Sequence, residues 1–324
     1  MTILVTGSAG HLGEALMQTL RTNGHAVRGI DIRPSSYTDD VGSIADRGFV
    51  RSIMAGIRTV LHTATLHKPH LATHSDRDFV DTNLTGTLNL LEESVSQEVD
   101  RFVFTSTTST FGSVLTPEPG DPAVWVTEEV APVPKNIYGV TKVAAEGLCE
   151  IFHRRHGLSI IVLRVSRFFP EADRDDTKQR GYSSENVLAN ELLYRRVDIA
   201  DVVSAHLLAA QKARRIGFRR YIISATTPFD STDLFSLRQN AAGVVQRLFP
   251  DCASLYARHG WKLFPDIGRV YVNRLAVEQL GWKPIYDFRH VLDCLRTGRD
   301  FRSRSETDID AEDEMFTEGS RPIA

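Results

Sequence analysis

Apolar runs of strand length alternate with longer amphipathic stretches through the first half of the chain. Runs rich in valine, isoleucine and leucine predict strands at residues 2–6, 26–31, 58–63, 101–105 and 159–164. Segments of helical length separate them, at residues 11–23, 48–55, 77–97 and 138–156. Strands that alternate with helices of this length form right-handed βαβ units. We therefore expect an α/β fold with a doubly wound parallel sheet.

This regular alternation ends near Pro170. A charged, irregular stretch follows, then a helical segment and a further strand candidate at residues 220–224. We expect the main domain to comprise residues 1–170 and 196–225. A smaller C-terminal lobe, at the carboxyl ends of the strands, would comprise residues 171–195 and 226–298. Residues 299–324 are acidic and show no periodicity, so we expect a disordered acidic tail there.

The composition is that of an ordinary globular protein. Of the 324 residues, 42% are hydrophobic and 24% are charged, which argues against a disordered or fibrous chain. The net charge of -3 gives no general attraction to nucleic acid or to an anionic membrane. Cys149, Cys252 and Cys294 are too far apart in the sequence to suggest a zinc site. No apolar run is long enough to span a membrane, so we expect a cytoplasmic protein without nucleic-acid or membrane partners.

A glycine-rich turn, Thr6-Gly7-Ser8-Ala9-Gly10-His11-Leu12-Gly13, follows the first strand candidate directly. Gly7 permits a tight turn, Gly10 a close approach to a pyrophosphate, and Gly13 close packing of the helix on the sheet. About twenty residues later Asp31 ends the second strand, where a carboxylate binds the ribose hydroxyls and repels a 2'-phosphate. This context is typical of a Rossmann-type domain that binds NAD rather than NADP. The alternative is an ordinary strand-to-helix turn.

Tyr138 and Lys142 are four residues apart in the last of the predicted helices, which places both on one face. A tyrosine with an ordinary pKa near 10 needs a nearby cation to act as an acid or base at neutral pH. We expect the lysine ammonium to stabilise the phenolate. The alternative is a solvated helix face.

A hydroxyl-rich stretch at residues 105–110 ends the fourth strand candidate, at the edge of the sheet where ligands bind. With this stretch, the glycine turn, Asp31, Tyr138 and Lys142, the chain resembles the extended short-chain dehydrogenase/reductase family, also called the NAD-dependent epimerase/dehydratase group. The resemblance reaches to about residue 295. Further segments carry it: Val60-Leu61-His62-Thr63-Ala64, Asn83-Leu84-Thr85-Gly86-Thr87 and Leu280-Gly281-Trp282-Lys283-Pro284.

The resemblance implies roles for individual residues. Tyr138 would be the catalytic acid/base, Lys142 its partner and Thr107 the catalytic hydroxyl, with Ser106 as the competing candidate. The residues expected to bind NAD are Gly7, Gly10, His11, Leu12, Gly13, Asp31, Ile32, Thr63, Ala64, Thr105, Tyr138 and Lys142. Those expected to bind substrate are His67, Thr107, Thr108 and Arg167.

Departures from the family pattern narrow the range of reactions expected of this chain. Dehydratases have Asp and Glu directly after the catalytic Thr, where this chain has Thr108 and Ser109, so dehydration is not expected. Arg167 stands where sugar-nucleotide epimerases place an Asn. The Phe-Pro-Glu at 169–171 is similar to that of uronate dehydrogenases, although those enzymes have a Ser at the position of Arg167. This arginine would bind a carboxylate or phosphate, or alternatively form a structural ion pair.

His67 and His70 follow a strand end, and we interpret them as pocket-lining or plain loop residues. No third ligand stands at a supporting spacing, so no metal site is expected.

The expected function is that of an NAD-dependent oxidoreductase or epimerase acting on a secondary alcohol of a sugar or sugar-acid-like substrate. One alternative is a sugar-nucleotide 4-epimerase with tightly bound NAD. Another is a non-catalytic NAD-sensing protein, which the intact Tyr138 and Lys142 disfavour.

Relatives pair the helices at 77–97 and 138–156 across a two-fold axis, so we expect a homodimer. The apolar residues considered for this interface are Leu84, Leu88, Leu91, Ala145, Leu148 and Phe152. The same residues would alternatively pack on the sheet.

Overall fold

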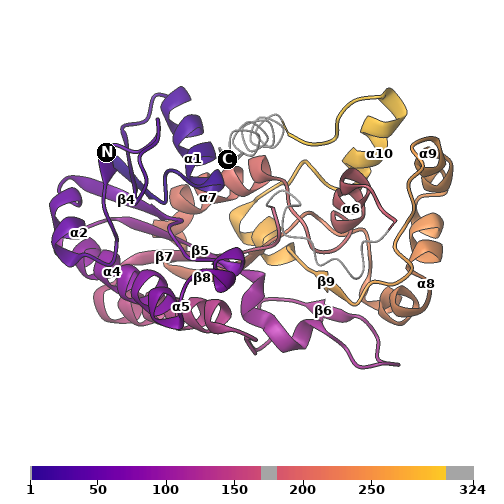
Figure 1. Ribbon diagram of the computed structural model, residues 1–324, viewed down its shortest axis with the longest axis horizontal. Helices are drawn as coiled ribbons and strands as arrows, with labels where there is room; N and C mark the ends of the chain where they lie inside the picture. The colour runs from indigo at the N-terminus through magenta and orange to yellow at the C-terminus, as the bar shows by residue number, and fades with distance from the viewer. Residues whose placement is uncertain (1, 169–180, 304–324) are drawn as a thin grey trace, which may run out of the picture.

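The computed structural model describes residues 2–168 and 181–303, and its centre is a seven-stranded parallel sheet (Figure 1). The strand order is β3-β2-β1-β4-β5-β7-β8. The change of direction between β1 and β4 is the switch point at which doubly wound sheets bind ligands. The strands are β1 (Thr2–Thr6), β2 (Val27–Asp31), β3 (Asp40–Val41), β4 (Ile57–His62), β5 (Arg101–Thr107), β7 (Ser159–Val165) and β8 (Phe218–Ile223). The expected α/β fold is confirmed.

Helices cover both faces of this sheet. On one face lie α1 (His11–Thr22) and α7 (Ile199–Ile216), and on the other α2 (Arg47–Ile53), α4 (Gly86–Ser96) and α5 (Ile137–His156). The helix expected at 77–97 is not regular. It consists of α3 (Asp76–Phe79), a π-helical turn η2 (Val80–Thr85) and α4. Such turns inside helices are frequent at functional sites.

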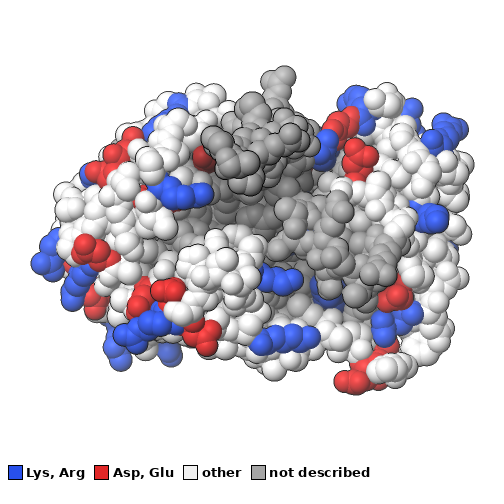
Figure 2. All heavy atoms as spheres, in the orientation of Figure 1, with Lys and Arg blue, Asp and Glu red and all other residues white. Residues whose placement is uncertain are grey.

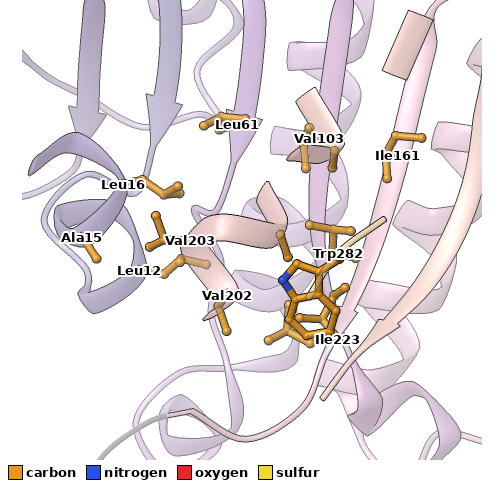
Figure 3. Packing of buried hydrophobic residues seen from close by; sticks show 14 of the residues in the cluster. Leu12, Ala15, Leu16, Leu61, Val103, Ile161, Val202, Val203, Ile223 and Trp282 are labelled. Carbon is orange, nitrogen blue, oxygen red and sulfur yellow. The ribbon is translucent and has the colours of Figure 1, made fainter. Parts of the chain in front are cut away.

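The core on the α1 and α7 side is made of aliphatic side chains from both helices and from the central strands. Figure 3 shows how these side chains meet between the layers, with Trp282 closing one end. The Trp282 indole is buried, and its Nε1 donates to the Asp201 carbonyl at 3.2 Å and to Ser204 Oγ at 3.0 Å. The other residues labelled in the figure are Leu12, Ala15, Leu16, Leu61, Val103, Ile161, Val202, Val203 and Ile223.

The opposite core fixes two of the residues considered for a dimer interface. Leu91 on α4 and Ala145 on α5 are fully buried in the core between these helices and the sheet. For these two residues the alternative, packing within one chain, is correct. Leu84, Leu148 and Phe152 are only partly buried against the same core.

A second apolar core lies beyond the carboxyl ends of the main strands (Figure 1). Phe301 belongs to it, and Ser303 N donates to Asp198 Oδ2 at 2.9 Å, so the chain is packed through Ser303. The Phe169–Glu171 motif and the acidic segment from residue 304 onward lie outside the described residues. The elements in this region are β6 (Val124–Val126), α6 (Ser184–Glu191), η4 (Ser231–Asp233), α8 (Leu234–Leu248), α9 (Cys252–Arg258), β9 (Arg269–Tyr271) and α10 (Phe288–Thr297). The π-helical turn η5 (Ala276–Leu280) packs instead on the first core, beside α7 and β8. β6 and β9 pair in parallel as a separate two-stranded sheet.

Candidate active site

A cavity of about 1220 Å³ runs along the carboxyl ends of the main strands. It exceeds the ~300–1,000 Å³ typical of small-molecule sites, so it has room for a dinucleotide beside a second small molecule. The glycine turn and Asp31 line one end, and Arg167, Arg195 and Arg269 line the other.

Two glycines in the turn after β1 are required by close backbone contacts. Gly7 has φ of 74°, and a Cβ there would lie 2.8 Å from Ala64 Cα. A Cβ on Gly13 would lie 1.9 Å from the Gly7 carbonyl oxygen. Gly10 is the N-cap of α1 and offers no side-chain cap, so the first amides of this twelve-residue helix face the cavity. A pyrophosphate fits this cradle of backbone amides at a helix N-terminus.

Asp31 lies beside the same turn. Its carboxylate accepts hydrogen bonds from Ala9 N at 3.1 Å and Arg33 N at 2.9 Å, which leaves further acceptor positions toward the cavity. The Arg33 guanidinium is two-thirds exposed and donates to the Ala9 carbonyl at 2.6 Å. Ile32, also exposed, provides an apolar surface at this end. These groups fit an adenosine with free ribose hydroxyls.

Tyr138 and Thr107 meet in the middle of the cavity. Burial raises the pKa of Tyr138 to about 12, while a hydrogen bond with the Thr107 side chain acts in the opposite direction. Ser106, the competing hydroxyl, is on the other face of β5 and donates to the buried Glu146 Oε1 at 2.6 Å. Thr107 is therefore the hydroxyl that the fold places next to Tyr138.

Lys142 is on the same side of α5 as Tyr138, but its ammonium lies beneath the end of β5. Nζ donates to the Thr105 carbonyl at 2.6 Å and lies 4.1 Å from the centre of the Phe104 ring. The side chain is 2% exposed, and burial lowers the pKa of Lys142 to about 7. Burial is the main cause of the pKa shift of both Tyr138 and Lys142. The stabilisation of the phenolate by Lys142 stays a prediction.

Residues next to these complete the middle of the cavity. The Thr105 hydroxyl is 2.8 Å from Nε2 of the buried His206. Thr63 Oγ1 donates to the Thr6 carbonyl at 2.6 Å, and Ala64 N donates to Thr6 Oγ1 at 3.1 Å, so both residues lie against the glycine turn. Thr63, Ala64, Thr105 and Thr108 all line the cavity, as do His11 and Leu12.

His67 and His70 also line the cavity. Burial, with smaller contributions from His70 and other nearby cations, lowers the pKa of His67 to about 4. Its backbone N donates to His70 Nδ1 at 3.0 Å, and the two rings are 4.5 Å apart between centroids. Within residues 2–168 and 181–303, no group of three or more potential ligands has the geometry to hold a metal ion.

The far end of the cavity carries arginines, two of which sequence reasoning missed. Arg167 Nη1 lies 4.0 Å from Oε1 of Glu191, a fully buried carboxylate that also pairs with Arg195 and Arg196. Burial alone would raise the pKa of Glu191, but Arg195, Arg196 and Arg167 bring it below its usual value.

Arg195 and Arg269 have a common feature: the Nε of each is buried and has no hydrogen-bond partner. Arg269 lies on β9 with Tyr271, whose ring centroid is 5.9 Å from the guanidinium carbon. Buried N–H groups without partners are uncommon and call for an explanation. Both arginines line the cavity, and guanidinium groups bind carboxylates and phosphates in a bidentate manner.

The sequence matches the NAD dependent epimerase/dehydratase family over residues 3–223, about two thirds of the chain. The chain belongs to this family. The expectation of an NAD-dependent enzyme of the extended short-chain dehydrogenase/reductase type is thereby confirmed.

Individual relatives of this family are similar over different lengths. The uncharacterized protein y4nG of Sinorhizobium fredii is 34% identical over 168 residues, which are 50% of this chain and 40% of that protein. A putative UDP-glucose 4-epimerase of Methanocaldococcus jannaschii is 24% identical over 89% of this chain and 94% of its own length. The solved structure of a short-chain dehydrogenase/reductase superfamily protein from Agrobacterium tumefaciens, with bound NAD, has a TM-score of 0.64 at 22% identity. That match covers 97% of this chain and 100% of the other, and it supports the fold.

No helix among the described residues has both the length and the hydropathy needed to cross a membrane.

Proposed function

We propose that this family member oxidises a secondary alcohol of an anionic sugar or sugar acid by hydride transfer to NAD, with Tyr138 as the acid/base. The observation that carries the proposal is the pair formed by Tyr138 and Thr107. Their side chains share a hydrogen bond inside a cavity that has a dinucleotide cradle at one end and unpaired arginine N–H groups at the other.

The residues at the cradle fit NAD. Gly7, Gly10 and Gly13 would hold the pyrophosphate, Asp31 and Ile32 the adenosine, and the loop at residues 63–64 the remainder of the cofactor. When bound, NAD supplies the hydride acceptor and a positively charged ring that favours the tyrosine phenolate.

Tyr138 moves the proton. In the oxidising direction the phenolate accepts the proton of the substrate hydroxyl, while Thr107 donates a hydrogen bond that stabilises the charged form. In the reducing direction the raised pKa suits the phenol as an acid, because it holds its proton until the substrate oxygen develops negative charge. Lys142 fixes the Thr105 carbonyl and so positions the strand end beside Tyr138.

The anionic part of the substrate would bind at Arg167, Arg195 and Arg269. On the face shown in Figure 2, lysine and arginine side chains are interspersed with aspartate and glutamate, without a field of one sign. Selectivity for an anion must therefore arise from local pairing in the cavity. A carboxylate or phosphate there would pair with the guanidinium groups of Arg195 and Arg269, which line the cavity.

A second candidate is a sugar-nucleotide 4-epimerase that retains NAD and returns the hydride to the opposite face of the sugar. The similarity to the putative UDP-glucose 4-epimerase over 89% of this chain favours it. The size of the cavity is also compatible with a nucleotide substrate.

The test is a substrate screen with the purified protein. Mass spectrometry would first show whether NAD is retained, and NADH absorbance would then be followed with sugar acids, sugar phosphates and nucleotide sugars. We expect NADH formation with an anionic sugar and loss of at least about a thousandfold in kcat for Tyr138→Phe, the upper part of the range for acid–base catalysis. Tyr286→Phe, remote from the cavity, is the matched control. Activity of Tyr138→Phe within a few-fold of wild type would contradict the mechanism, and retained NAD with interconversion of sugars but no net NADH would favour the epimerase.

Arg167→Ala tests the anionic end. We expect a large rise in KM for the substrate and an NAD affinity within about twofold of wild type, as for the loss of a substrate contact. A lower melting temperature with unchanged KM would assign Arg167 to a structural ion pair with Glu191 instead.

We further propose a cytoplasmic homodimer that pairs α4 and α5 of two chains. Val140 on α5 is 48% exposed, and Leu84, Leu148 and Phe152 are only partly covered within one chain. Four helices from two chains would cover these apolar surfaces.

A further inference from the structure

His62, at the end of β4, is buried behind the cofactor cradle and contacts two hydroxyl groups. Its side chain is 1% exposed. Nδ1 lies 2.8 Å from Thr6 Oγ1, and Nε2 lies 3.0 Å from Thr87 Oγ1. The imidazole therefore links β1 to α4 across the first strands of the sheet.

The neighbouring hydrogen bonds determine which nitrogen carries the proton. The Thr87 hydroxyl donates to the Asn83 carbonyl at 2.7 Å, so its oxygen accepts from His62 Nε2–H. Nδ1 is then the bare nitrogen and accepts from the Thr6 hydroxyl. Thr6 Oγ1 accepts in turn from Ala64 N at 3.1 Å. Only the neutral Nε2–H tautomer of His62 gives every donor in this series of hydrogen bonds an acceptor.

Burial lowers the pKa of His62 well below its ordinary value, and the charge of Lys142 acts in the same direction. Burial therefore favours the neutral form of the ring.

Both ends of the chain of hydrogen bonds reach the loop at residues 63–66, which lines the cavity. At one end, Ala64 is held against Gly7, where an added Cβ would touch the Ala64 backbone. At the other end is Asn83 in the π-helical turn. Its side chain accepts from Leu66 N at 2.8 Å and donates to the Leu66 carbonyl at 2.9 Å and to Thr141 Oγ1 at 3.1 Å.

Thr141 precedes Lys142 on α5, so the Asn83 side chain joins this loop to the helix that carries Tyr138. We propose that His62 is a positioning residue. Its fixed tautomer locks the loop at residues 63–66 between the glycine turn and the catalytic helix. NAD affinity then depends on a histidine that touches neither cofactor nor substrate. The inference rests on the proposed function only for the place of NAD in the cavity.

Thr87→Val tests this, because it removes the acceptor for His62 Nε2–H with little change in shape. NAD affinity is measured by calorimetry, without turnover, so the outcome is independent of whether the proposed reaction is correct. We expect the Kd for NAD to rise about tenfold, because the variant leaves His62 Nε2–H without an acceptor and also removes the hydrogen bond to the Asn83 carbonyl. Thr87→Ser keeps the hydroxyl and should bind within about twofold of wild type. Ser94→Ala, which removes a buried α4 hydroxyl that has no partner, is the control and should leave Kd unchanged.

An unchanged Kd for Thr87→Val, with a lower melting temperature, would show that this series of hydrogen bonds only stabilises the fold, and it would overturn the proposal. Nitrogen-15 NMR of the wild-type histidines provides a second measurement if the valine variant fails to fold. The His62 signals are assigned by their loss in His62→Gln, and a protonated Nε2 with a bare Nδ1 on that ring supports the proposal. A charged His62 ring, or its opposite tautomer, contradicts it.

Discussion

Lys142→Met should make the protein more stable at neutral pH while abolishing its activity. The ammonium is 2% exposed and has no carboxylate in direct contact, because its Nζ hydrogen bond goes to the Thr105 carbonyl. Methionine has a similar length and no charge, so it fills the same space against Phe104 without the cost of desolvation.

The magnitude follows from the shift in pKa. Burial lowers the pKa of Lys142 from 10.5 to about 7. At about 1.4 kcal/mol per unit, the desolvated lysine destabilises the folded state by roughly 4 kcal/mol at pH 7. The substitution also loses the hydrogen bond and the contact of the ammonium with the Phe104 ring, together about 2 kcal/mol. The expected net gain is on the order of 2 kcal/mol, or roughly 4 °C in melting temperature.

The pH dependence distinguishes this cause from improved packing. The folded pKa is below the unfolded one, so the unfolded chain binds the extra proton between about pH 7 and 10.5. The destabilisation is fully present below pH 7 and is relieved as the pH rises toward 10.5. The advantage of Lys142→Met should shrink over that window in thermal melts of the protein without cofactor. Lys135→Met, at an exposed position, is the control and should show no such trend. A methionine variant less stable than wild type at pH 7, or an advantage independent of pH, would refute the reasoning.

Three further predictions concern other parts of the site. Asp31→Ala should weaken NAD binding and reduce discrimination against NADP, because the 2'-phosphate no longer meets a carboxylate. Titration with both cofactors would measure this, and an unchanged preference for NAD would exclude a role of Asp31 in cofactor selection. Gly13→Ala should abolish NAD binding or folding, since its Cβ would lie 1.9 Å from the Gly7 oxygen, and a variant that binds NAD normally in calorimetry would contradict the geometry. Burial lowers the pKa of His206 to about 4, below its unfolded value, so stability should be lost as pH falls from about 6.5 to 4, by up to ~3 kcal/mol. Urea unfolding of wild type and His206→Asn at about pH 6.5 and pH 4 would measure this loss of stability. Equal losses in the two proteins would rule out His206 as its cause.

The central strands of the main sheet, β1, β4, β5 and β7, could be predicted from the sequence because each carries an apolar run that is largely buried. β4, for example, carries Ile57, Val60 and Leu61 in the core. The short strands β3, β6 and β9 could not, since two or three residues carry no periodicity. The π-helical turn at η2 was also missed. It depends on Asn83 meeting Leu66 and Thr141 from other parts of the chain, which no local pattern records.

The cofactor end of the site could also be predicted from the sequence, because its requirements are local. Gly7 and Gly13 act through the backbone of one turn, so their spacing contains the whole requirement. The choice between Ser106 and Thr107 needed the structure. Both are hydroxyls at one strand end, and only the pleat of β5 shows that the first faces Glu146 and the second Tyr138. Arg269 gave no signal at all, because a three-residue strand brings it to the cavity from the far end of the chain.

The two ends of the cavity share one energetic feature. At the catalytic helix the fold buries the Lys142 ammonium, and at the far end it buries the Nε atoms of Arg195 and Arg269, which have no hydrogen-bond partner. Glu191 is fully buried, pairs with Arg195 and Arg196, and lies at the limit of contact with Arg167. Uncompensated buried cations destabilise a folded chain. An anion that binds to them relieves this cost only in the folded state, so its affinity adds directly to stability. The anionic substrate proposed above would complete the arginine end of the cavity in this way.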